Sequence, residues 1–412
     1  MQSSQSKLPA HRLMQRMKVA HITTIDMPLR YFLLNQLLSI QQAGYDVSGI
    51  SSPGPEVPVI EAAGIRHIPV PMTRRFTPLA DLVSLWRLIR ILRRGGFTIV
   101  HAHFPKPALL GQLAARFVGV PIVVRTLHGF YFHDLMHPIV RRFYITLEKI
   151  AAHCSDLILS VNKEDVDTAV REGICDLTKI QLIGPGGIGL DLTRFDPKCV
   201  SHLTIAQKRA ELGIPNNARV VGFVGRLVEE KGVLELLQAA RIVMQGIPEV
   251  RFLIIGPIDH EKPGAITPAA AGEYGVADKS IFTGMRQDMP ELYALMDVFV
   301  LPSYIEGFPR SAMEASAMGI PCVVTDVRGC RDAVVHERSG LLVPLGDIRA
   351  LADSIIAILS DPDLARRMGE EGRRMALERF DEKLVFERVE TEYARLLIQK
   401  GIAVAQTGSL AP

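Results

Sequence analysis

The sequence predicts an α/β protein with two doubly wound parallel-sheet domains that face each other across a cleft. Short apolar, β-rich runs alternate with longer helical patterns from Met17 onward. The runs are apolar on both faces, as in a parallel sheet that helices cover on both sides. The alternation breaks once near the middle and then restarts, and 412 residues suffice for two such domains.

The first half of the chain carries seven of these runs and four clear helical patterns. The expected strands are residues 19–24, 47–50, 67–70, 99–101, 122–126, 157–161 and 180–183, and the expected helices are residues 30–43, 79–93, 106–118 and 139–152. Each helix follows a strand closely enough to cross over to the next parallel strand.

The break covers residues 183–199, where glycine, proline and aspartate gather as they do in a connection between domains. Residues 184–189 match a dinucleotide-binding pattern letter by letter. Pro185 removes one backbone donor, however, and no helix begins there, so we interpret the segment as the connection.

The second half repeats the pattern with expected strands at residues 220–224, 252–255, 281–283, 298–301, 322–325 and 341–343. We therefore expect an N-terminal domain over 17–195 and a C-terminal domain over 196–380. An amphipathic helix over 381–400 could pack on either domain or cross back to the first. Residues 1–16 and 401–412 are expected to be disordered tails.

Composition excludes several function classes. The net charge of +3 gives no general nucleic-acid signature. The five cysteines show no paired spacing, which favours reduced thiols in the cytoplasm. No apolar run is long enough to cross a bilayer, and the polar first 16 residues lack the apolar stretch of a signal peptide.

The end of the strand at 220–224 carries a candidate phosphate site. Gly225 permits close approach of a ligand, Arg226 follows it, and Lys231 opens the next helix. A helix N-terminus favours an anion. The Arg guanidinium can donate two parallel hydrogen bonds to a phosphate, and the Lys ammonium adds a positive charge. A solvated Arg and Lys beside two glutamates is the alternative.

The end of the strand at 298–301 carries two carboxylates, Glu306 on a loop and Glu314 in the following helix. Carboxylates accept hydrogen bonds from vicinal hydroxyls, as in ribose recognition. The backbone N–H groups of Gly307 and Phe308 suit a sugar or phosphate oxygen. The alternative is that both acids lie near the helix N-terminus only because they interact favourably with the helix dipole. This alternative explains Glu314 poorly.

In the first domain, His128 follows the strand at 122–126 and can donate or accept near a sugar. An ordinary loop histidine is the alternative. His101 and His103 could suggest a metal pair, but no third ligand follows at a metal-like spacing. We therefore expect no metal site, and these two histidines stay unassigned.

Residues 73–96 form a basic amphipathic segment with a tryptophan. Such a helix can lie on an anionic membrane surface. A sheet-covering helix whose arginines reach for solvent is the alternative.

Taken together, these motifs resemble the retaining glycosyltransferases of family four, which have the GT-B fold. The resemblance rests on Gly-Arg-x₄-Lys-Gly at 225–232, Glu-Gly-x-Pro-x₄-Glu at 306–314 and Gly-x-Pro-x-Val-x-Thr-Asp at 319–326, and it extends from Met17 to about residue 399. The residues after the first strand depart from it, because they lack the glycine-rich loop of some relatives.

The resemblance implies roles for the two domains and for these residues. The domain over 17–195 would lie on the acceptor side, and the domain over 196–380 would bind the donor nucleotide. Arg226 and Lys231 would hold the donor diphosphate, Glu306 would contact sugar hydroxyls near the reacting carbon, and Glu314 would bind the ribose. His128 would contact the donor sugar, so that His128 and Glu306 are the catalytic candidates.

The resemblance also implies a reaction and a setting. The enzyme would transfer a sugar, with retention, from a UDP- or GDP-sugar to a polyprenyl-linked or other glycan acceptor in exopolysaccharide, capsule or lipopolysaccharide synthesis. It would use no cofactor and act in the cytoplasm or on the inner membrane face. A nucleotide-sugar epimerase and a catalytically silent sugar-nucleotide-binding protein are the alternatives.

Overall fold

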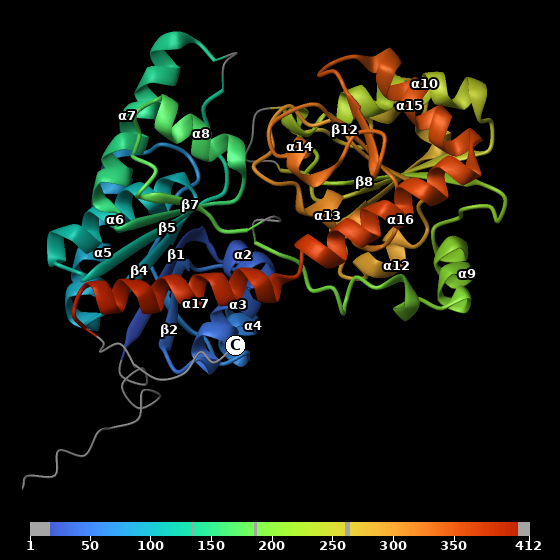
Figure 1. The fold of residues 1–412 in the computed structure, drawn as a ribbon. Helices are drawn as coiled ribbons and strands as arrows, with labels where there is room; N and C mark the ends of the chain where they lie inside the picture. The colour runs from blue at the N-terminus through green and yellow to red at the C-terminus, as the bar shows by residue number, and fades with distance from the viewer. Residues whose placement is uncertain (1–16, 134–135, 185–187, 260–263, 403–412) are drawn as a thin grey trace, which may run out of the picture. The chain divides into compact units, whose positions relative to one another are not determined.

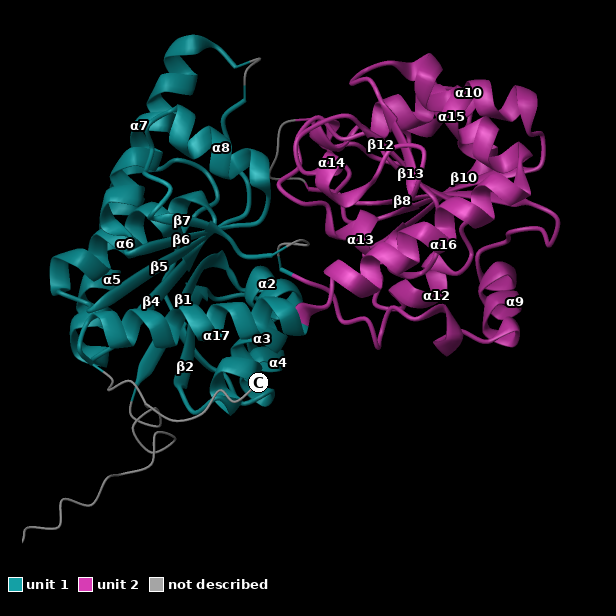
Figure 2. Ribbon diagram, viewed as in Figure 1, with its two compact units in different colours: residues 1–188, 383–412 teal, residues 189–382 magenta. Residues whose placement is uncertain are grey.

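The computed structural model describes residues 17–133, 136–184, 188–259 and 264–402. Contacts between residues divide the chain into two compact units (Figure 2). Unit 1 comprises residues 1–188 and 383–412, and unit 2 comprises residues 189–382. The expected tail at 1–16, residues 403–412 of the expected tail at 401–412, and residues 185–187 of the glycine-rich segment lie outside the described residues.

Unit 1 contains a seven-stranded, fully parallel sheet in the order β3-β2-β1-β4-β5-β6-β7. The strands are β1 (Lys18–Ile25), β2 (Asp46–Ser52), β3 (Arg66–Pro69), β4 (Ile99–His103), β5 (Ile122–Leu127), β6 (Leu157–Ser160) and β7 (Ile180–Leu182). All seven were expected from the sequence. β4 is buried along its whole length, as a central parallel strand must be.

Helices cover both faces of this sheet (Figure 1). They are α2 (Asp26–Pro28), the π-helical turn η1 (Leu29–Leu33), α3 (Leu34–Gln42), α4 (Val57–Ala62), α5 (Pro78–Gly95), α6 (Pro105–Val118), α7 (Pro138–Cys154), α8 (Lys163–Arg171) and α17 (Glu382–Gln399). Helix α6 packs on β1, β4 and β5 and lies between α5 and α7. The C-terminal helix α17 lies across the opposite face, so the end of the chain completes unit 1.

Unit 2 contains a six-stranded parallel sheet in the order β10-β9-β8-β11-β12-β13. The strands are β8 (Arg219–Val224), β9 (Val250–Ile255), β10 (Ser280–Gly284), β11 (Val298–Leu301), β12 (Cys322–Thr325) and β13 (Gly340–Val343). The flanking helices include α9 (His202–Glu211), α10 (Val233–Gly246), α12 (Met289–Tyr293), α13 (Arg310–Ala317), α14 (Cys330–Ala333), α15 (Ile348–Ser360) and α16 (Pro362–Arg379). Helices α10 and α15 pair on one face, and α13 and α16 pair on the other (Figure 1).

In both sheets the strand order reverses direction at one place. The chain winds outward from β1 to β3 and then returns to β4, and it winds from β8 to β10 and then returns to β11. Crevices at the carboxyl ends of strands on either side of such a reversal are the usual ligand sites of doubly wound sheets. The segments after β1, β4, β8 and β11 are therefore the places to look for chemistry. The predicted fold class, two doubly wound parallel sheets, is confirmed.

Candidate functional site

In unit 2, the two motif loops lie at the reversal point, because they follow the neighbouring strands β8 and β11. The Tyr304 N–H donates to the Glu230 carbonyl at 3.0 Å, which joins the loops directly. Gly232 has φ +71°, and a Cβ there would lie 2.0 Å from the Pro302 carbonyl oxygen. Only glycine allows this approach, so the two loops depend on it for their contact.

Lys231 and Glu306 meet at this junction. Their Nζ and Oε1 atoms are 2.6 Å apart, and both side chains are mostly buried. Lys231 ends the 3₁₀ turn η3 (Glu229–Lys231) just before α10, and Glu306 lies on the loop after β11. The structure therefore brings together a cation from the first motif and a carboxylate from the second, 75 residues apart in sequence.

Arg226 lies in the loop after β8, two residues beyond the end of that strand. Its Nη1 donates to Asp259 at 2.8 Å and its Nη2 donates to Glu230 at 2.7 Å. Asp259 follows β9 and is buried. Asp259 is not part of the Gly-Arg-x₄-Lys-Gly motif. It lies 33 residues from Arg226 in sequence and reaches Arg226 only through the pairing of β8 with β9. The two carboxylates hold the guanidinium in a fixed orientation beside the end of β8.

Glu314 is the fifth residue of α13 and is buried. One carboxylate oxygen accepts from the Tyr293 hydroxyl at 2.9 Å, and the other accepts from Arg310 Nε at 3.0 Å. Burial and the neighbouring Glu314 raise the pKa of Tyr293 well above 10, so the phenol stays a donor. Pro309 is the residue that immediately precedes α13.

Backbone geometry also brings Gly225 and Gly307 close to other strand ends. A Cβ on Gly256 would lie 1.8 Å from the Gly225 carbonyl oxygen, and a Cβ on Gly329 would lie 2.5 Å from the Gly307 carbonyl oxygen. Phe308 packs edge-on against Phe380. These close approaches require glycine at positions 256 and 329, and they fix the backbone that follows β8 and β11.

In unit 1, His128 follows β5 and is half-buried. Phe104 stacks on it with ring centroids 4.5 Å apart. Phe104 has φ +67° and ψ +160°, a conformation that only glycine adopts easily. Such strain gathers at functional sites, and here it holds an aromatic ring against the imidazole. Burial lowers the pKa of His128 to about 3, so the ring is neutral.

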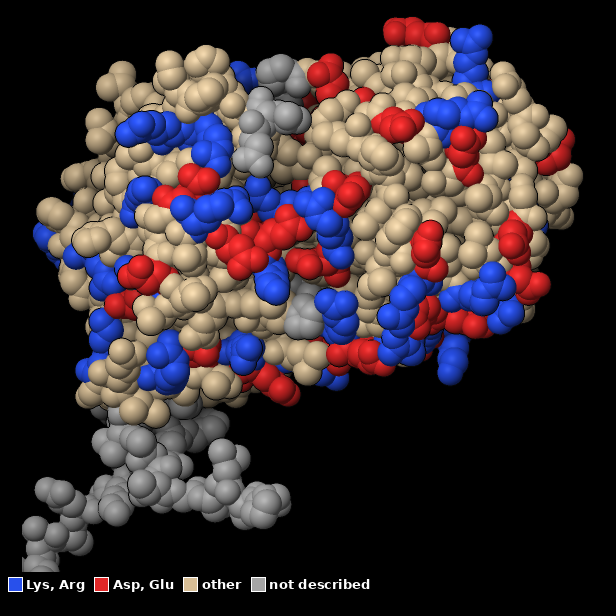
Figure 3. Space-filling model, turned by 45° about the horizontal axis from the view of Figure 1, so that its top comes forward, with Lys and Arg blue, Asp and Glu red and all other residues tan. Residues whose placement is uncertain are grey.

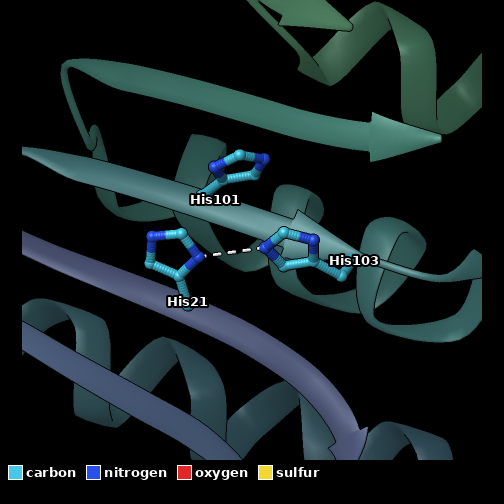
Figure 4. A group of neighbouring side chains, drawn as sticks. All are labelled: His21, His101 and His103. Carbon is cyan, nitrogen blue, oxygen red and sulfur yellow. Dashed lines mark hydrogen bonds between the residues drawn. The ribbon is translucent and has the colours of Figure 1, made fainter. Parts of the chain in front are cut away.

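Two more histidines that the sequence left unassigned lie beside His128. His101 and His103 of β4 are joined by His21 of β1, and one ring nitrogen of each lies within 4.8 Å of the others (Figure 4). Sequence spacing missed His21 because it precedes the pair by 80 residues. The register of β1 on β4, which sets His21 opposite His101, brings it there.

Arg226, Lys231, Glu306 and Glu314 all lie in unit 2, whereas His128 lies in unit 1. On the face of the molecule shown in Figure 3, basic and acidic side chains are interspersed. None of the described helices is long and apolar enough to cross a membrane.

Comparisons with known proteins match both units. Residues 204–375 match the family of group 1 glycosyl transferases, and residues 30–186 match the glycosyl transferase 4-like domain. The chain is 30% identical over 352 residues to the Escherichia coli UDP-Gal:alpha-D-GlcNAc-diphosphoundecaprenol alpha-1,3-galactosyltransferase, covering 84% of this chain and 89% of that one.

Two further relatives extend the comparison. The Staphylococcus aureus capsular polysaccharide biosynthesis glycosyltransferase CapM is 27% identical, with 93% and 98% of the two chains covered. Anabaena HepE in complex with UDP-glucose shares the fold, with a TM-score of 0.78 at 19% identity over 92% of this chain and 100% of that one. The chain therefore belongs to the family-four glycosyltransferases, has the GT-B fold and is an enzyme of that kind.

Proposed function

We propose that this glycosyltransferase moves a sugar from a UDP-sugar to a polyprenyl-diphosphate-linked glycan during the synthesis of a bacterial surface polysaccharide. The Lys231–Glu306 pair at the junction of the β8 and β11 loops carries the proposal. Two relatives support this choice of substrates. The Escherichia coli relative uses UDP-Gal and a diphosphoundecaprenol-linked acceptor, and HepE binds UDP-glucose. GDP-sugars stay the alternative donor class.

Arg226 and Lys231 hold the donor diphosphate in this proposal. A sugar that leaves a diphosphate places negative charge on the phosphate, and fixed cations nearby lower that barrier. In the free enzyme each cation is paired with carboxylates. A bound diphosphate therefore replaces these partners, and Glu306 becomes free to accept hydrogen bonds from the sugar.

Glu314 binds the ribose hydroxyls, and His128 contacts the donor sugar. Tyr293 and Arg310 orient the Glu314 carboxylate from within the fold, which leaves its remaining lone pairs for the hydroxyls. The N–H groups of Gly307 and Phe308 donate hydrogen bonds to a sugar or phosphate oxygen.

The reaction proceeds with retention of configuration. We assign no enzymic nucleophile, so the acceptor hydroxyl attacks from the face that the diphosphate leaves. The hydroxyl proton passes to the departing phosphate oxygen. This route needs no general base from the protein, which agrees with the neutral His128 of low pKa.

The segment at 73–96 meets the membrane surface that carries the acceptor. Helix α5 buries Ser84, Leu88 and Leu92, but Leu79 is 82% exposed and Trp86 is 57% exposed. Covering the sheet therefore accounts for only one side of the helix. The exposed side continues onto α7, because Phe76 packs edge-on against Phe143, which is itself exposed. Arg90 lies over the Trp86 ring, at 5.4 Å from its centroid.

A transfer assay tests the proposal. Purified enzyme is incubated with UDP-sugars or GDP-sugars, with and without a polyprenyl-diphosphate-linked monosaccharide, and the product anomer is assigned by proton NMR. We expect consumption of one UDP-sugar only when the acceptor is present, and an α-linked product from an α-linked donor. Consumption without acceptor, or a β-linked product, would contradict the proposal and would favour an epimerase or an inverting enzyme.

A further inference from the structure

Six side chains form an unbroken hydrogen-bonded chain inside unit 1 that ends at His128. It runs from Thr126 of β5 through His101, Tyr393, His21 and His103. The contacts, in order, are Thr126 Oγ1 to His101 Nε2 at 2.7 Å, His101 Nδ1 to Tyr393 Oη at 2.7 Å, Tyr393 Oη to His21 Nε2 at 3.3 Å, His21 Nδ1 to His103 Nε2 at 3.0 Å, and His103 Nδ1 to His128 Nε2 at 3.2 Å.

Strand alternation explains why these side chains meet. Ile22 and Ala102 face α6, where both lie within 4 Å of the position a Cβ on Gly111 would take. Since successive residues point to opposite faces, His21 and His103 point to the other face. Helix α17 covers that face and inserts Tyr393. All members except His128 are almost fully buried, so water does not interrupt the chain.

The four rings are neutral. Burial lowers the pKa of His21 to about 3 and lowers the pKa values of His101 and His103 well below 6.5. A neutral imidazole has one N–H donor and one acceptor nitrogen. Every contact in the chain needs one donor and one acceptor, so in each ring the choice at one nitrogen fixes the choice at the other. If Tyr393 accepted at both of its contacts, its own buried hydroxyl proton would have no partner among the described residues. Two arrangements of protons keep the Tyr393 proton within the chain, and they run in opposite directions.

The Thr126 end selects between them. If the Thr126 hydroxyl donates to His101, every proton and every acceptor along the chain is matched. In the reverse arrangement Thr126 accepts, and its own proton needs another acceptor. Within the described part of the chain Thr126 Oγ1 makes no second hydrogen bond. A buried hydroxyl proton without a partner costs roughly 1–3 kcal/mol, which favours the first arrangement.

We infer that this buried chain fixes His128 as the Nδ1–H tautomer, so that His128 presents a hydrogen-bond donor, and not an acceptor, to the ligand. His103 supplies the N–H that occupies His128 Nε2, and the remaining His128 proton lies on Nδ1. Thr126, His101, Tyr393, His21 and His103 act through His128 as positioning residues.

A metal ion is the competing occupant of the cluster formed by His21, His101 and His103. A metal would need an unprotonated nitrogen from each ring directed at one point. The Nδ1 and Nε2 atoms of all three rings instead contact neighbours within the chain, and the His101 and His103 rings are stacked at 4.3 Å. The geometry therefore favours the hydrogen-bonded chain.

The consequence for catalysis rests on the proposal that His128 contacts the donor sugar, whereas the tautomer itself does not. A neutral N–H donor stabilises an oxygen that gains negative charge or offers lone pairs, such as a sugar hydroxyl or a phosphate oxygen. It cannot accept the proton of the acceptor hydroxyl. His128 then serves as an electrostatic contact and not as a general base.

Nitrogen-15 NMR of the histidine rings tests the inference directly, because protonated and unprotonated ring nitrogens resonate in separate regions. His128→Gln assigns the His128 signals by their loss. We expect Nδ1 protonated and Nε2 unprotonated at His128. An Nε2–H tautomer at His128, or stoichiometric zinc in protein purified without chelator, would overturn the inference whatever the enzyme transfers.

A matched pair of variants separates the polarity of the chain from packing. Thr126→Val keeps the shape but removes the terminal donor, and Thr126→Ser keeps the donor. We expect Thr126→Val to give mixed tautomers at His128 and to lower kcat/KM by about tenfold or more, as a wrong tautomer does. Thr126→Ser should restore both. Unchanged His128 signals in Thr126→Val would contradict the inference.

Tyr393→Phe breaks the chain from the side of α17. Tyr45→Phe is its control, because Tyr45 is buried, packs edge-on against Tyr393 at 6.0 Å and takes no part in the chain. Tyr393→Phe should alter the His128 signals, and Tyr45→Phe should not. Identical spectra for the two variants would mean that Tyr393 only packs, and that the chain does not reach His128.

Discussion

At the scale of single residues, the two glutamates of the second motif differ in what surrounds them. Glu306 touches a cation that the proposed donor also needs, whereas both Glu314 oxygens are held by Tyr293 and Arg310. Glu306 is therefore placed to change partners when ligand binds, and Glu314 is placed to stay still. This contrast underlies different roles in turnover and in binding.

We predict that Glu306→Gln leaves the Kd of the UDP-sugar within a few-fold and lowers kcat by about a hundredfold, since its contacts strengthen only as the sugar departs. Glu314→Gln should raise Kd by about tenfold, which corresponds to about 1.4 kcal/mol of lost binding free energy. Calorimetric titration and initial rates measure the two quantities. Equal and small effects of both substitutions would remove the division of roles.

Site residues that lie close together in sequence can be predicted from it, whereas residues that meet only in the folded chain cannot. Arg226, Lys231, Glu306 and Glu314 belong to compact motifs and could be named from the sequence. Asp259, Tyr293 and Tyr393 could not, because each reaches its partner only through strand order or helix packing. The signal that could have revealed the histidine cluster was the alternation of His101 and His103 along a strand, which puts both on one face.

At the scale of elements, all thirteen strands of the described residues could be predicted, because parallel strands buried on both faces give continuous apolar runs. The order of the strands within each sheet is not given by these runs. Inferring it needs the general rule that crossover connections are short and right-handed. The helix expected at 30–43 is instead an irregular succession of α2, η1 and α3 from Asp26 to Gln42. Its π-helical turn depends on local packing that periodicity does not report.

Helix α5 is the element whose surface the fold leaves unexplained. We predict that replacing Arg87, Arg90, Arg93 and Arg94 with Gln reduces cosedimentation with anionic vesicles severalfold at low salt, since each basic group near such a surface contributes about 1 kcal/mol. Replacing Arg366, Arg367 and Arg374 of α16 with Gln is the control and should change nothing. Equal binding of the α5 variant and the wild type would leave α5 as a helix that only covers the sheet.

At the scale of the whole molecule, the histidine cluster links the stability of unit 1 to pH. Burial lowers the folded-state pKa of His21 to about 3, whereas an unfolded histidine has a pKa of about 6.5. Below pH 6.5 the unfolded state therefore binds more protons than the folded state. The contribution of His21 is fully present above pH 6.5 and is lost as pH falls toward 3.

We predict that the free energy of unfolding of unit 1 falls by roughly 2 kcal/mol from His21 alone between pH 7 and pH 5, since one pKa unit corresponds to about 1.4 kcal/mol. The other buried histidines add to this loss. Urea titration followed through Trp86, the single tryptophan, reports on unit 1. The pH dependence should be shallower in His21→Gln. Equal stability at pH 7 and pH 5 would mean that the rings are not held neutral.

Calorimetric titration of UDP and the UDP-sugars shows whether the junction after β8 binds the donor diphosphate. Arg226 and Arg219 flank β8 at opposite ends, and each pairs with an aspartate, so Arg219→Gln is the matched control for Arg226→Gln. We predict that wild type and Arg219→Gln bind UDP equally, and that Arg226→Gln binds at least about tenfold more weakly, with and without magnesium. Equal affinity of all three proteins for UDP, or no binding of UDP by the wild type at millimolar concentration, would mean that the junction after β8 does not bind the donor diphosphate.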